Sequence, residues 1–202
     1  MGRITVLAFI GSPRRGGNTE TLVASVMKGV ARAGAVGDTI RLADLSIAPC
    51  MGCGGCQKSG HCVIMDNMQP LYDKILAAQA VILASPIYFY ALSAQTKLFV
   101  DRLQALWSRK QLLMSAGQWL IDPGKCGYLV SVAATKGDKI FVGAQLTAQY
   151  AFDAMGYSYC GDLLVRGVDQ RGAIKTMSDK LLEAEEFGVN ICRRAVSGGQ
   201  EK

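Results

Sequence analysis

Histidine is almost absent from this sequence, since His61 is the only one among 202 residues. A hydrolase that relies on a cysteine, a histidine and an acid is therefore poorly supported. We interpret His61 as an exposed loop residue, and a hydrogen bond from its ring to a nearby metal centre is the alternative.

The sequence also lacks a long apolar run. No stretch approaches the roughly 20 residues that a membrane-spanning helix needs. The opening segment MGRITVLAFIGS has neither the long apolar region nor the cleavage site of a signal peptide. We therefore expect a cytoplasmic protein. Half of the residues are apolar and 19% are charged, which predicts a single globular domain over residues 1–202.

A concentrated basic block is missing as well. The formal net charge is +6, but no basic run and no regular alternation of basic and aromatic residues accompanies it. Nucleic-acid binding is therefore disfavoured. The mild excess of positive charge instead suits phosphate-bearing or acidic partners.

What the sequence does contain is an alternation of apolar runs and amphipathic segments. Residues 4–12 form a near-continuous apolar run that ends in a turn, which is typical of a strand buried on both faces. The alternation predicts a three-layer, doubly wound α/β fold with a five-stranded parallel sheet. Strands are predicted at 4–12, 38–45, 80–86, 125–135 and 157–167, and helices at 18–34, 66–79, 93–110 (capped by Ser93), 138–155 and 173–196.

Ligands of such sheets bind beyond the carboxyl ends of the strands, so the loops that follow the strands are informative. The loop GSPRRGGNT at 11–19 combines glycines, hydroxyls, an amide and two arginines. These groups suit a terminal phosphate, and the spacing matches neither the dinucleotide nor the ATP-binding glycine motif. A generic strand-to-helix turn with a polar cap is the alternative.

The loop after the third strand is rich in apolar and aromatic residues. It contains Pro86, Ile87, Tyr88, Phe89 and Tyr90 directly beyond a buried strand. A flat, redox-active ring needs such surfaces to lie against. Core packing would explain one or two of these residues, but five favour a ligand.

Four of the seven cysteines occur in the stretch PCMGCGGCQKSGHC, which begins the cysteine-rich loop at 49–66. Their spacing is C-x2-C-x2-C-x5-C, and thiolates are soft ligands for iron-sulfur clusters or zinc. Structural zinc sites more commonly use two separated C-x2-C pairs. A reactive dithiol and a structured loop at a subunit interface also remain open. These cysteines are Cys50, Cys53, Cys56 and Cys62; we interpret Cys126, Cys160 and Cys192 as buried apolar residues.

The two loops and the cysteine stretch, followed by MDNM, occur in an order and spacing that resemble the flavodoxin-fold NADPH-dependent FMN reductases, and among them the iron-sulfur flavoproteins. The resemblance covers about residues 3–165. It implies strand order 2-1-3-4-5, FMN as cofactor and a [4Fe-4S] cluster on the four cysteines. It further implies that Ser12, Arg14, Gly17, Asn18 and Thr19 hold the FMN phosphate, that Pro86, Ile87, Tyr88 and Phe89 line the isoalloxazine ring, and that Thr135 and Gly137 close its other side.

The resemblance therefore predicts a flavin-dependent oxidoreductase that passes electrons through the cluster and FMN to a small-molecule acceptor. It suggests a ferredoxin-like donor, with NAD(P)H as the alternative, and a homodimer or homotetramer. A cluster-free NAD(P)H-dependent FMN or quinone reductase is the second hypothesis. A flavodoxin-like electron carrier and a zinc-stapled binding module are non-enzymatic alternatives, and the positive charge argues against the carrier.

Overall fold

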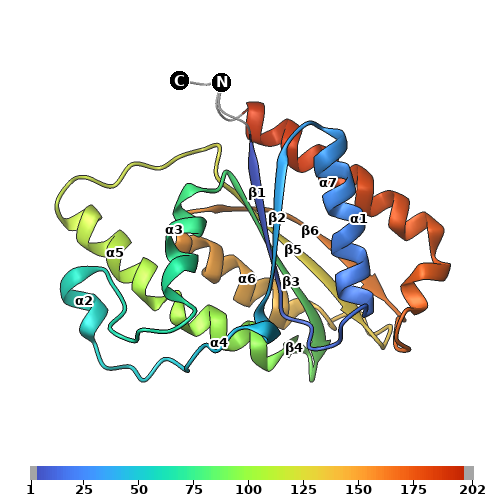
Figure 1. Cartoon of the computed structure of the whole chain (residues 1–202), viewed down its shortest axis with the longest axis horizontal. Helices are drawn as coiled ribbons and strands as arrows, with labels where there is room; N and C mark the ends of the chain where they lie inside the picture. The colour runs from blue at the N-terminus through green and yellow to red at the C-terminus, as the bar shows by residue number, and fades with distance from the viewer. Residues whose placement is uncertain (1–3, 198–202) are drawn as a thin grey trace.

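A parallel sheet forms the centre of the computed structural model, which describes residues 4–197. Five strands lie in the order β2-β1-β3-β5-β6 (Figure 1). This confirms the predicted doubly wound fold and strand order. A short sixth strand, β4, pairs antiparallel with the end of β3 and was not predicted. The strands are β1 (Thr5–Ile10), β2 (Val36–Arg41), β3 (Ala80–Tyr88), β4 (Ala91–Leu92), β5 (Cys126–Ala133) and β6 (Ser158–Arg166).

Helices cover both faces of the sheet. Helices α1 and α7 lie on one face, and α3, α4, α5 and α6 lie on the other (Figure 1). The helices are α1 (Asn18–Arg32), α2 (Gly55–Ser59), α3 (Gln69–Ala77), α4 (Ala94–Arg102), α5 (Gln104–Ser115), α6 (Val142–Met155) and α7 (Ser178–Ser197), with 3-10 turns η1 (Leu42–Asp44) and η2 (Ala173–Thr176).

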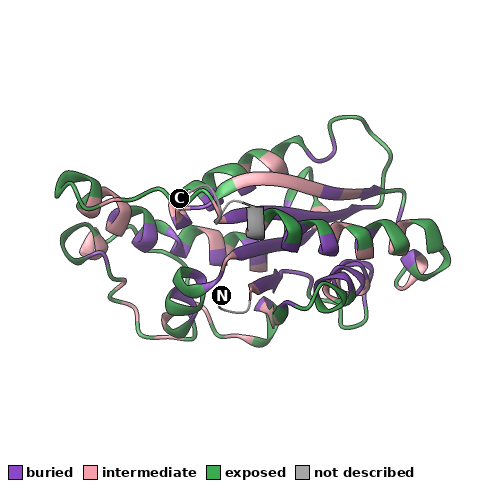
Figure 2. Ribbon diagram, turned by 90° about the horizontal axis from the view of Figure 1, so that it is seen from above, coloured by how far each residue is buried: buried purple, intermediate pink, exposed green. Residues whose placement is uncertain are grey.

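The central strands are apolar on both sides because each side has its own helical layer. In β1, Val6, Ala8 and Ile10 pack into the core beneath α1 and α7. Leu7 and Phe9 point the opposite way, into the core beneath α3 to α6. Successive side chains of a strand alternate between faces, so a near-continuous apolar run is what two cores require. Figure 2 shows the buried sheet between helices whose outer faces are exposed.

Helices α1 and α7 approach each other closely at two glycines. A Cβ atom on Gly29 would lie 1.9 Å from the carbonyl oxygen of Glu185, and one on Gly188 would lie 2.0 Å from that of Val26. Any larger residue at either position would push the helices apart. This contact packs α1 closely against α7 on the same face of the sheet. The amino end of α1 lies at the carboxyl edge of the strands.

The structure changes the bounds of several predicted elements. The helix predicted at 93–110 is two helices, α4 and α5, which join at Leu103. Ser93 caps α4 as predicted, because its side chain accepts a hydrogen bond from the Thr96 N–H. The helix predicted at 173–196 begins only at Ser178, after η2. Between residues 4 and 197, no helix is long and apolar enough to cross a membrane.

Cys126 is buried in the core, as predicted, and Cys160 is only partly buried and packs against the same core. Neither is a separate apolar residue, because the two form a disulfide. Cys126 is paired with Ser158 on the neighbouring strand, and the register shifts between Gly127 and Tyr128. Cys160 is the extra residue at this bulge, and its Cα atom lies 5.6 Å from that of Cys126. Cys192 is a free, buried cysteine, as predicted.

Candidate functional site

The loop after β1 is held in place by contacts at both of its ends. The Gly11 N–H donates to the carbonyl oxygen of Ala84 at 2.8 Å. The carboxylate of Glu20 accepts the Gly16 N–H at 2.6 Å and pairs with Arg41 at 2.7 Å. The start of α1 therefore faces a preformed loop. Helix N-termini with free amide groups favour anions, and this one has small residues around it.

This loop and three others surround a small cleft of about 80 Å³ at the carboxyl edge of the sheet. Eight residues predicted to bind FMN come together there, from segments about 70 residues apart in sequence. The cleft is lined by Ser12, Arg14, Gly17, Asn18, Thr19, Pro86, Ile87, Tyr88, Val132, Ala134, Val168, Asp169 and Arg171.

Three predicted residues lie outside this lining. Phe89 is fully exposed at the tip of the β3–β4 hairpin. The carbonyl oxygen of Thr135 accepts the Gly167 N–H at 3.4 Å. Gly137 lies beside Tyr90, with 3.4 Å between the Tyr90 hydroxyl and the position that a Cβ would take. The loop after β5 instead contributes Val132 and Ala134 to the cleft.

The loop after β6 was missed by the sequence reasoning. It brings Asp169 and Arg171 to the cleft, and Arg171 donates to the carbonyl oxygen of Arg15 at 2.5 Å. The position of this loop, directly after a predicted strand, could have indicated it, because the carboxyl ends of all parallel strands meet at one edge of the sheet. The loop after the last strand therefore belonged with the other loops that were predicted to bind FMN, at residues 11–19, 86–89 and 135–137.

The side chain of Asn18 is engaged within the protein. Its Nδ2 donates to the carbonyl oxygen of Gln170 at 2.8 Å, and its Oδ1 accepts the Ile174 N–H at 3.2 Å. Asn18 therefore ties the start of α1 to the segment after β6. The second N–H of its Nδ2 and its backbone N–H remain as donors for a phosphate.

A buried hydroxyl network lies directly beneath the cleft. The Ser93 hydroxyl donates to the carbonyl oxygen of Gly11 at 2.6 Å, and the Ser93 N–H donates to the Ser85 hydroxyl at 2.9 Å. The Ser131 hydroxyl donates to the carbonyl oxygen of Ser85 at 2.7 Å. These four residues join the ends of β1, β3 and β5 to α4. The network fixes the relative positions of the loops above it.

The hairpin beyond β3 carries backbone strain. Phe89 and Tyr90 form its two-residue turn with φ angles of 49° and 62°. This left-handed region suits glycine or asparagine and is unfavourable for bulky aromatic residues. Strain of this kind often accompanies functional sites, and here it places an exposed aromatic ring next to the cleft.

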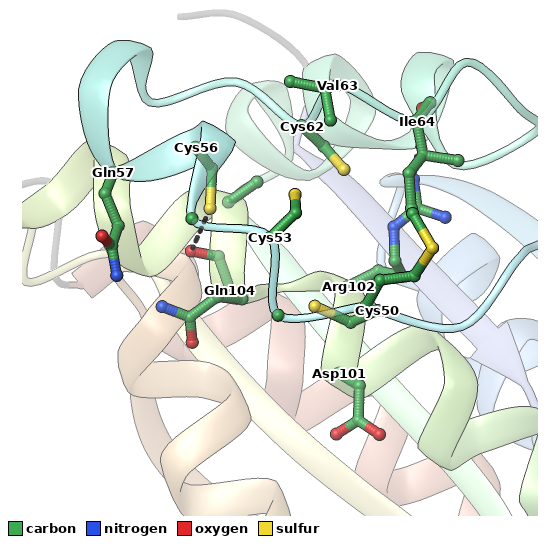
Figure 3. Close-up of a pocket in the computed structure, with 14 residues that line it drawn as sticks. Cys50, Cys53, Cys56, Gln57, Cys62, Val63, Ile64, Asp101, Arg102 and Gln104 are labelled. Carbon is green, nitrogen blue, oxygen red and sulfur yellow. Dashed lines mark hydrogen bonds between the residues drawn. The ribbon is translucent and has the colours of Figure 1, made fainter.

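A second cavity, of about 370 Å³, lies between the cysteine-rich loop and helices α4 and α5 (Figure 3). All four cysteines line it, together with Asp101, Arg102, Gln104 and Ala105 among others, and none of the four is in a disulfide. Within residues 4–197, no three histidine, cysteine or acidic side chains stand as a ready-made metal site.

The four cysteines differ in burial. Cys50 and Cys53 are exposed, whereas Cys56 and Cys62 are half-buried and pack against the core. The Ser108 hydroxyl on α5 donates to the sulfur of Cys56 at 3.4 Å. His61 is exposed and does not line the cavity.

A buried ion pair holds the cysteine-rich loop to α4. Arg102 is 1% exposed, and its guanidinium bonds to both carboxylate oxygens of Asp66, at 2.5 and 3.2 Å. Burial alone would raise the pKa of Asp66, but its hydrogen bonds with Arg102, Ala48 and Met68 outweigh that effect and lower the pKa. The sequence reasoning missed this pair because its members are 36 residues apart.

Helix α4 connects the two regions. Its cap, Ser93, lies under the cleft, and Arg102 in its last turn lies at the cysteine cavity. A nine-residue helix spans roughly 13 Å.

The parallel sheet in this order, with a polar loop at the start of α1 and an apolar hairpin beyond β3, defines a flavodoxin-like protein of the flavin-binding class. Residues 4–153 match the NADPH-dependent FMN reductase family. The chain therefore belongs to this family, a family of flavin-dependent oxidoreductases, and within it to the iron-sulfur flavoprotein type.

Several curated relatives carry the latter name. The chain is 38% identical to an iron-sulfur flavoprotein of Methanocaldococcus jannaschii over 55% of this chain and 58% of that one. It is 32% identical to an iron-sulfur flavoprotein of Methanosarcina thermophila over 74% of this chain and 72% of that one. The matches thus leave a substantial part of each relative uncovered.

A solved structure, a flavone reductase, superposes with a TM-score of 0.69 at 19% identity. The superposition covers 98% of this chain and 65% of the reductase. Identity this low shows the shared fold alone.

Proposed function

We propose that this protein is an FMN-dependent oxidoreductase of the iron-sulfur flavoprotein type, with a [4Fe-4S] cluster on Cys50, Cys53, Cys56 and Cys62. The observation that carries the proposal is that four free thiols line one cavity in a chain with a flavin-type cleft. Electrons would pass through the cluster and FMN to a small-molecule acceptor.

The residues of the cleft suit FMN. The hydroxyls of Ser12 and Thr19 are buried at the start of α1, and Arg14 and Arg171 supply positive charge. Together with backbone N–H groups of α1 they would hold the phosphate. Bound FMN supplies one- and two-electron chemistry.

The aromatic hairpin would take part in holding the ring. Pro86, Ile87 and Tyr88 form an apolar wall of the cleft, which would orient the flat ring and keep water from one face. We propose that Phe89, Thr135 and Gly137, which flank the cleft, contact the ring or its substrate at the rim.

The residues of the second cavity suit a cluster. Four thiols can become four thiolate ligands, and the half-buried Cys56 and Cys62 pack against apolar surface that would shield a cluster from water. The same four thiolates could also bind a zinc ion, so a metal analysis has to distinguish zinc from an iron-sulfur cluster.

The electron donor would be a ferredoxin-like protein or NAD(P)H. We further propose a homodimer or homotetramer. Large apolar side chains are exposed at Trp107, Leu120, Ile121 and Tyr150, and such residues are commonly covered in an assembly.

The experiment is a count of iron, acid-labile sulfide, zinc and FMN in protein purified without oxygen, together with its absorbance spectrum. We expect about four iron, four sulfide and one FMN per chain. FMN without iron or sulfide, even after reconstitution, would overturn the assignment of a cluster. The remaining hypothesis would then be a cluster-free NAD(P)H-dependent FMN or quinone reductase. Stoichiometric zinc without FMN would overturn the proposal that the protein is a flavin-dependent oxidoreductase.

Two cysteine variants sharpen this test. Cys53→Ser should lose the iron-sulfur absorbance and keep FMN, because it removes one ligand from the cavity. Cys192→Ser is the matched control: Cys192 is buried in the core beneath α1 and α7, away from both cavities, so its cofactor content should match the wild type. Full iron content in Cys53→Ser would contradict the ligand assignment.

A further inference from the structure

Arg102 is the largest fully buried side chain among the described residues. Its Nη1 donates to Asp66 at 2.5 Å and to the carbonyl oxygen of Ala48 at 2.8 Å. Its Nη2 donates to Asp66 at 3.2 Å and to the carbonyl oxygen of Ile64 at 3.3 Å. Both terminal nitrogens therefore hold the two ends of the cysteine-rich loop, before Cys50 and after Cys62.

The third nitrogen of the same guanidinium is different. The Nε of Arg102 is buried and has no hydrogen-bond partner anywhere in residues 4–197. A buried donor without an acceptor costs about 1–3 kcal/mol, and native proteins keep very few of them. A bound group that supplies the acceptor would explain why this one is retained.

A group bound in the cavity lined by the four cysteines could supply this acceptor. Arg102 lines this cavity together with all four cysteines. Figure 3 shows its side chain at the cavity wall beside Ile64, with the sulfur atoms of Cys53 and Cys62 pointing into the same space. Of these two cysteines, Cys53 is exposed and Cys62 is half-buried. Cys62 also lies two positions before Ile64, whose carbonyl oxygen accepts a hydrogen bond from the same guanidinium at 3.3 Å.

We propose that the Arg102 Nε–H donates a hydrogen bond to the sulfur of Cys62 when that sulfur ligates the cluster, and that this bond raises the reduction potential of the cluster. The inference rests on the proposed function. Hydrogen bonds to cluster sulfurs and nearby positive charge favour the reduced state, because the added electron makes the sulfurs stronger acceptors. Arginine keeps its proton at all ordinary pH values, so the donor is permanent.

Arg102→Lys separates the ion pair of this residue with Asp66 from the proposed hydrogen bond of its Nε. Lysine keeps the positive charge and can still pair with Asp66, but it lacks the separate Nε donor. Arg109→Lys is the matched control: Arg109 is on α5 and packs against the loop at Gly60, and it is not part of the cavity lining. Both variants are prepared without oxygen, and their iron and sulfide are counted.

The readout is the cluster potential, measured by a spectroscopic redox titration. We expect the ratio of reduced to oxidised cluster in Arg102→Lys, at a fixed applied potential, to fall about tenfold, which corresponds to about 59 mV for one electron. Arg109→Lys should match the wild type. An unchanged potential in Arg102→Lys with full iron content would overturn the inference and leave the proposed function standing.

A second measurement on the wild-type holoprotein covers the case in which Arg102→Lys does not retain a cluster. Protein labelled with ¹⁵N-arginine should show a ¹⁵N coupling to the reduced cluster in pulsed electron paramagnetic resonance, and Arg109→Lys should keep it. Absence of that coupling in wild type and control would overturn the role of Arg102. Absence of iron from the wild type would overturn the proposed function itself, and the inference with it.

Discussion

The hydroxyl of Ser93 donates a 2.6 Å hydrogen bond to the carbonyl oxygen of Gly11. The two residues are 82 positions apart in sequence, and their contact joins the cap of α4 to the loop that begins the candidate phosphate site. The same hydroxyl accepts the Thr96 N–H at 3.3 Å. One buried side chain thus serves both the helix and the loop.

Ser93→Ala should therefore lower both stability and FMN affinity. Loss of the cap costs about 1 kcal/mol, and leaving the Gly11 carbonyl buried without its donor adds a further ~1–2 kcal/mol. Urea denaturation measures the loss of stability, and FMN fluorescence quenching on the apoprotein measures the loss of FMN affinity. Ser115→Ala is the control, because Ser115 is exposed and bonds only within α5. Equal stabilities of the two variants would contradict the role of Ser93.

Arg171→Gln should weaken FMN binding about tenfold, because it removes a positive charge from the cleft that would hold the phosphate. Riboflavin, which has no phosphate, is the control ligand, and its affinity should not change. Raising the salt concentration should bring the FMN affinity of the wild type closer to that of the variant, because Arg171 is exposed and salt screens its charge. An equal loss for both ligands would show that Arg171 supports only the shape of the loop.

Asp66→Asn should destabilise the protein by about 3 kcal/mol at neutral pH, because it leaves the buried Arg102 charge unpaired. The pKa of Asp66 is lowered from its ordinary 3.8 by its hydrogen bonds in the folded protein. The carboxylate therefore contributes its full stability above about pH 5, and this contribution is lost as the pH falls through the lowered folded pKa.

The stability difference between wild type and Asp66→Asn should accordingly shrink below pH 4, as measured by urea denaturation between pH 7 and pH 3. Asp101→Asn is the control, since Asp101 forms an exposed pair with Lys97 on the same helix and should change stability by only about 0.5 kcal/mol. A difference that stays constant down to pH 3 would contradict the lowered pKa.

Loss of the disulfide should cost about 3–4 kcal/mol, the chain-entropy value for a cross-link between cysteines 34 residues apart. Cys126→Ala, Cys160→Ala and the double variant should all lose a similar amount, because each breaks the same bond. Wild-type stability should fall on addition of a thiol reductant, and that of the variants should not. Additive losses in the double variant would show that the cysteines act separately.

The elements that could be predicted from sequence are those whose cause is local. The apolar run of β1 reflects a strand buried on both faces, and Ser93 has the residue type and position of a helix cap. The strand order followed from the family resemblance, which depends on short loop motifs. The residues of the loops after β1 and β3 were named in advance for the same reason, and the structure brings most of them together.

The contacts that were missed join segments distant in sequence. Asn18 is tied to Gln170, and Arg102 to Asp66. No local preference encodes such pairs, because only the packing of α1, α4 and β6 on the sheet brings their side chains within hydrogen-bonding distance. The division of the helix at Leu103 likewise has no proline or glycine to mark it.

The sequence by itself thus determined the alternation of strands and helices, the chemistry of the loops and the supply of four thiols. Tertiary structure alone decided that Cys160 meets Cys126, that Arg171 reaches the cleft, and that a buried arginine borders the cysteine cavity. Secondary structure depends on residues a few positions apart, whereas a site depends on which chain segments the folded core places next to each other.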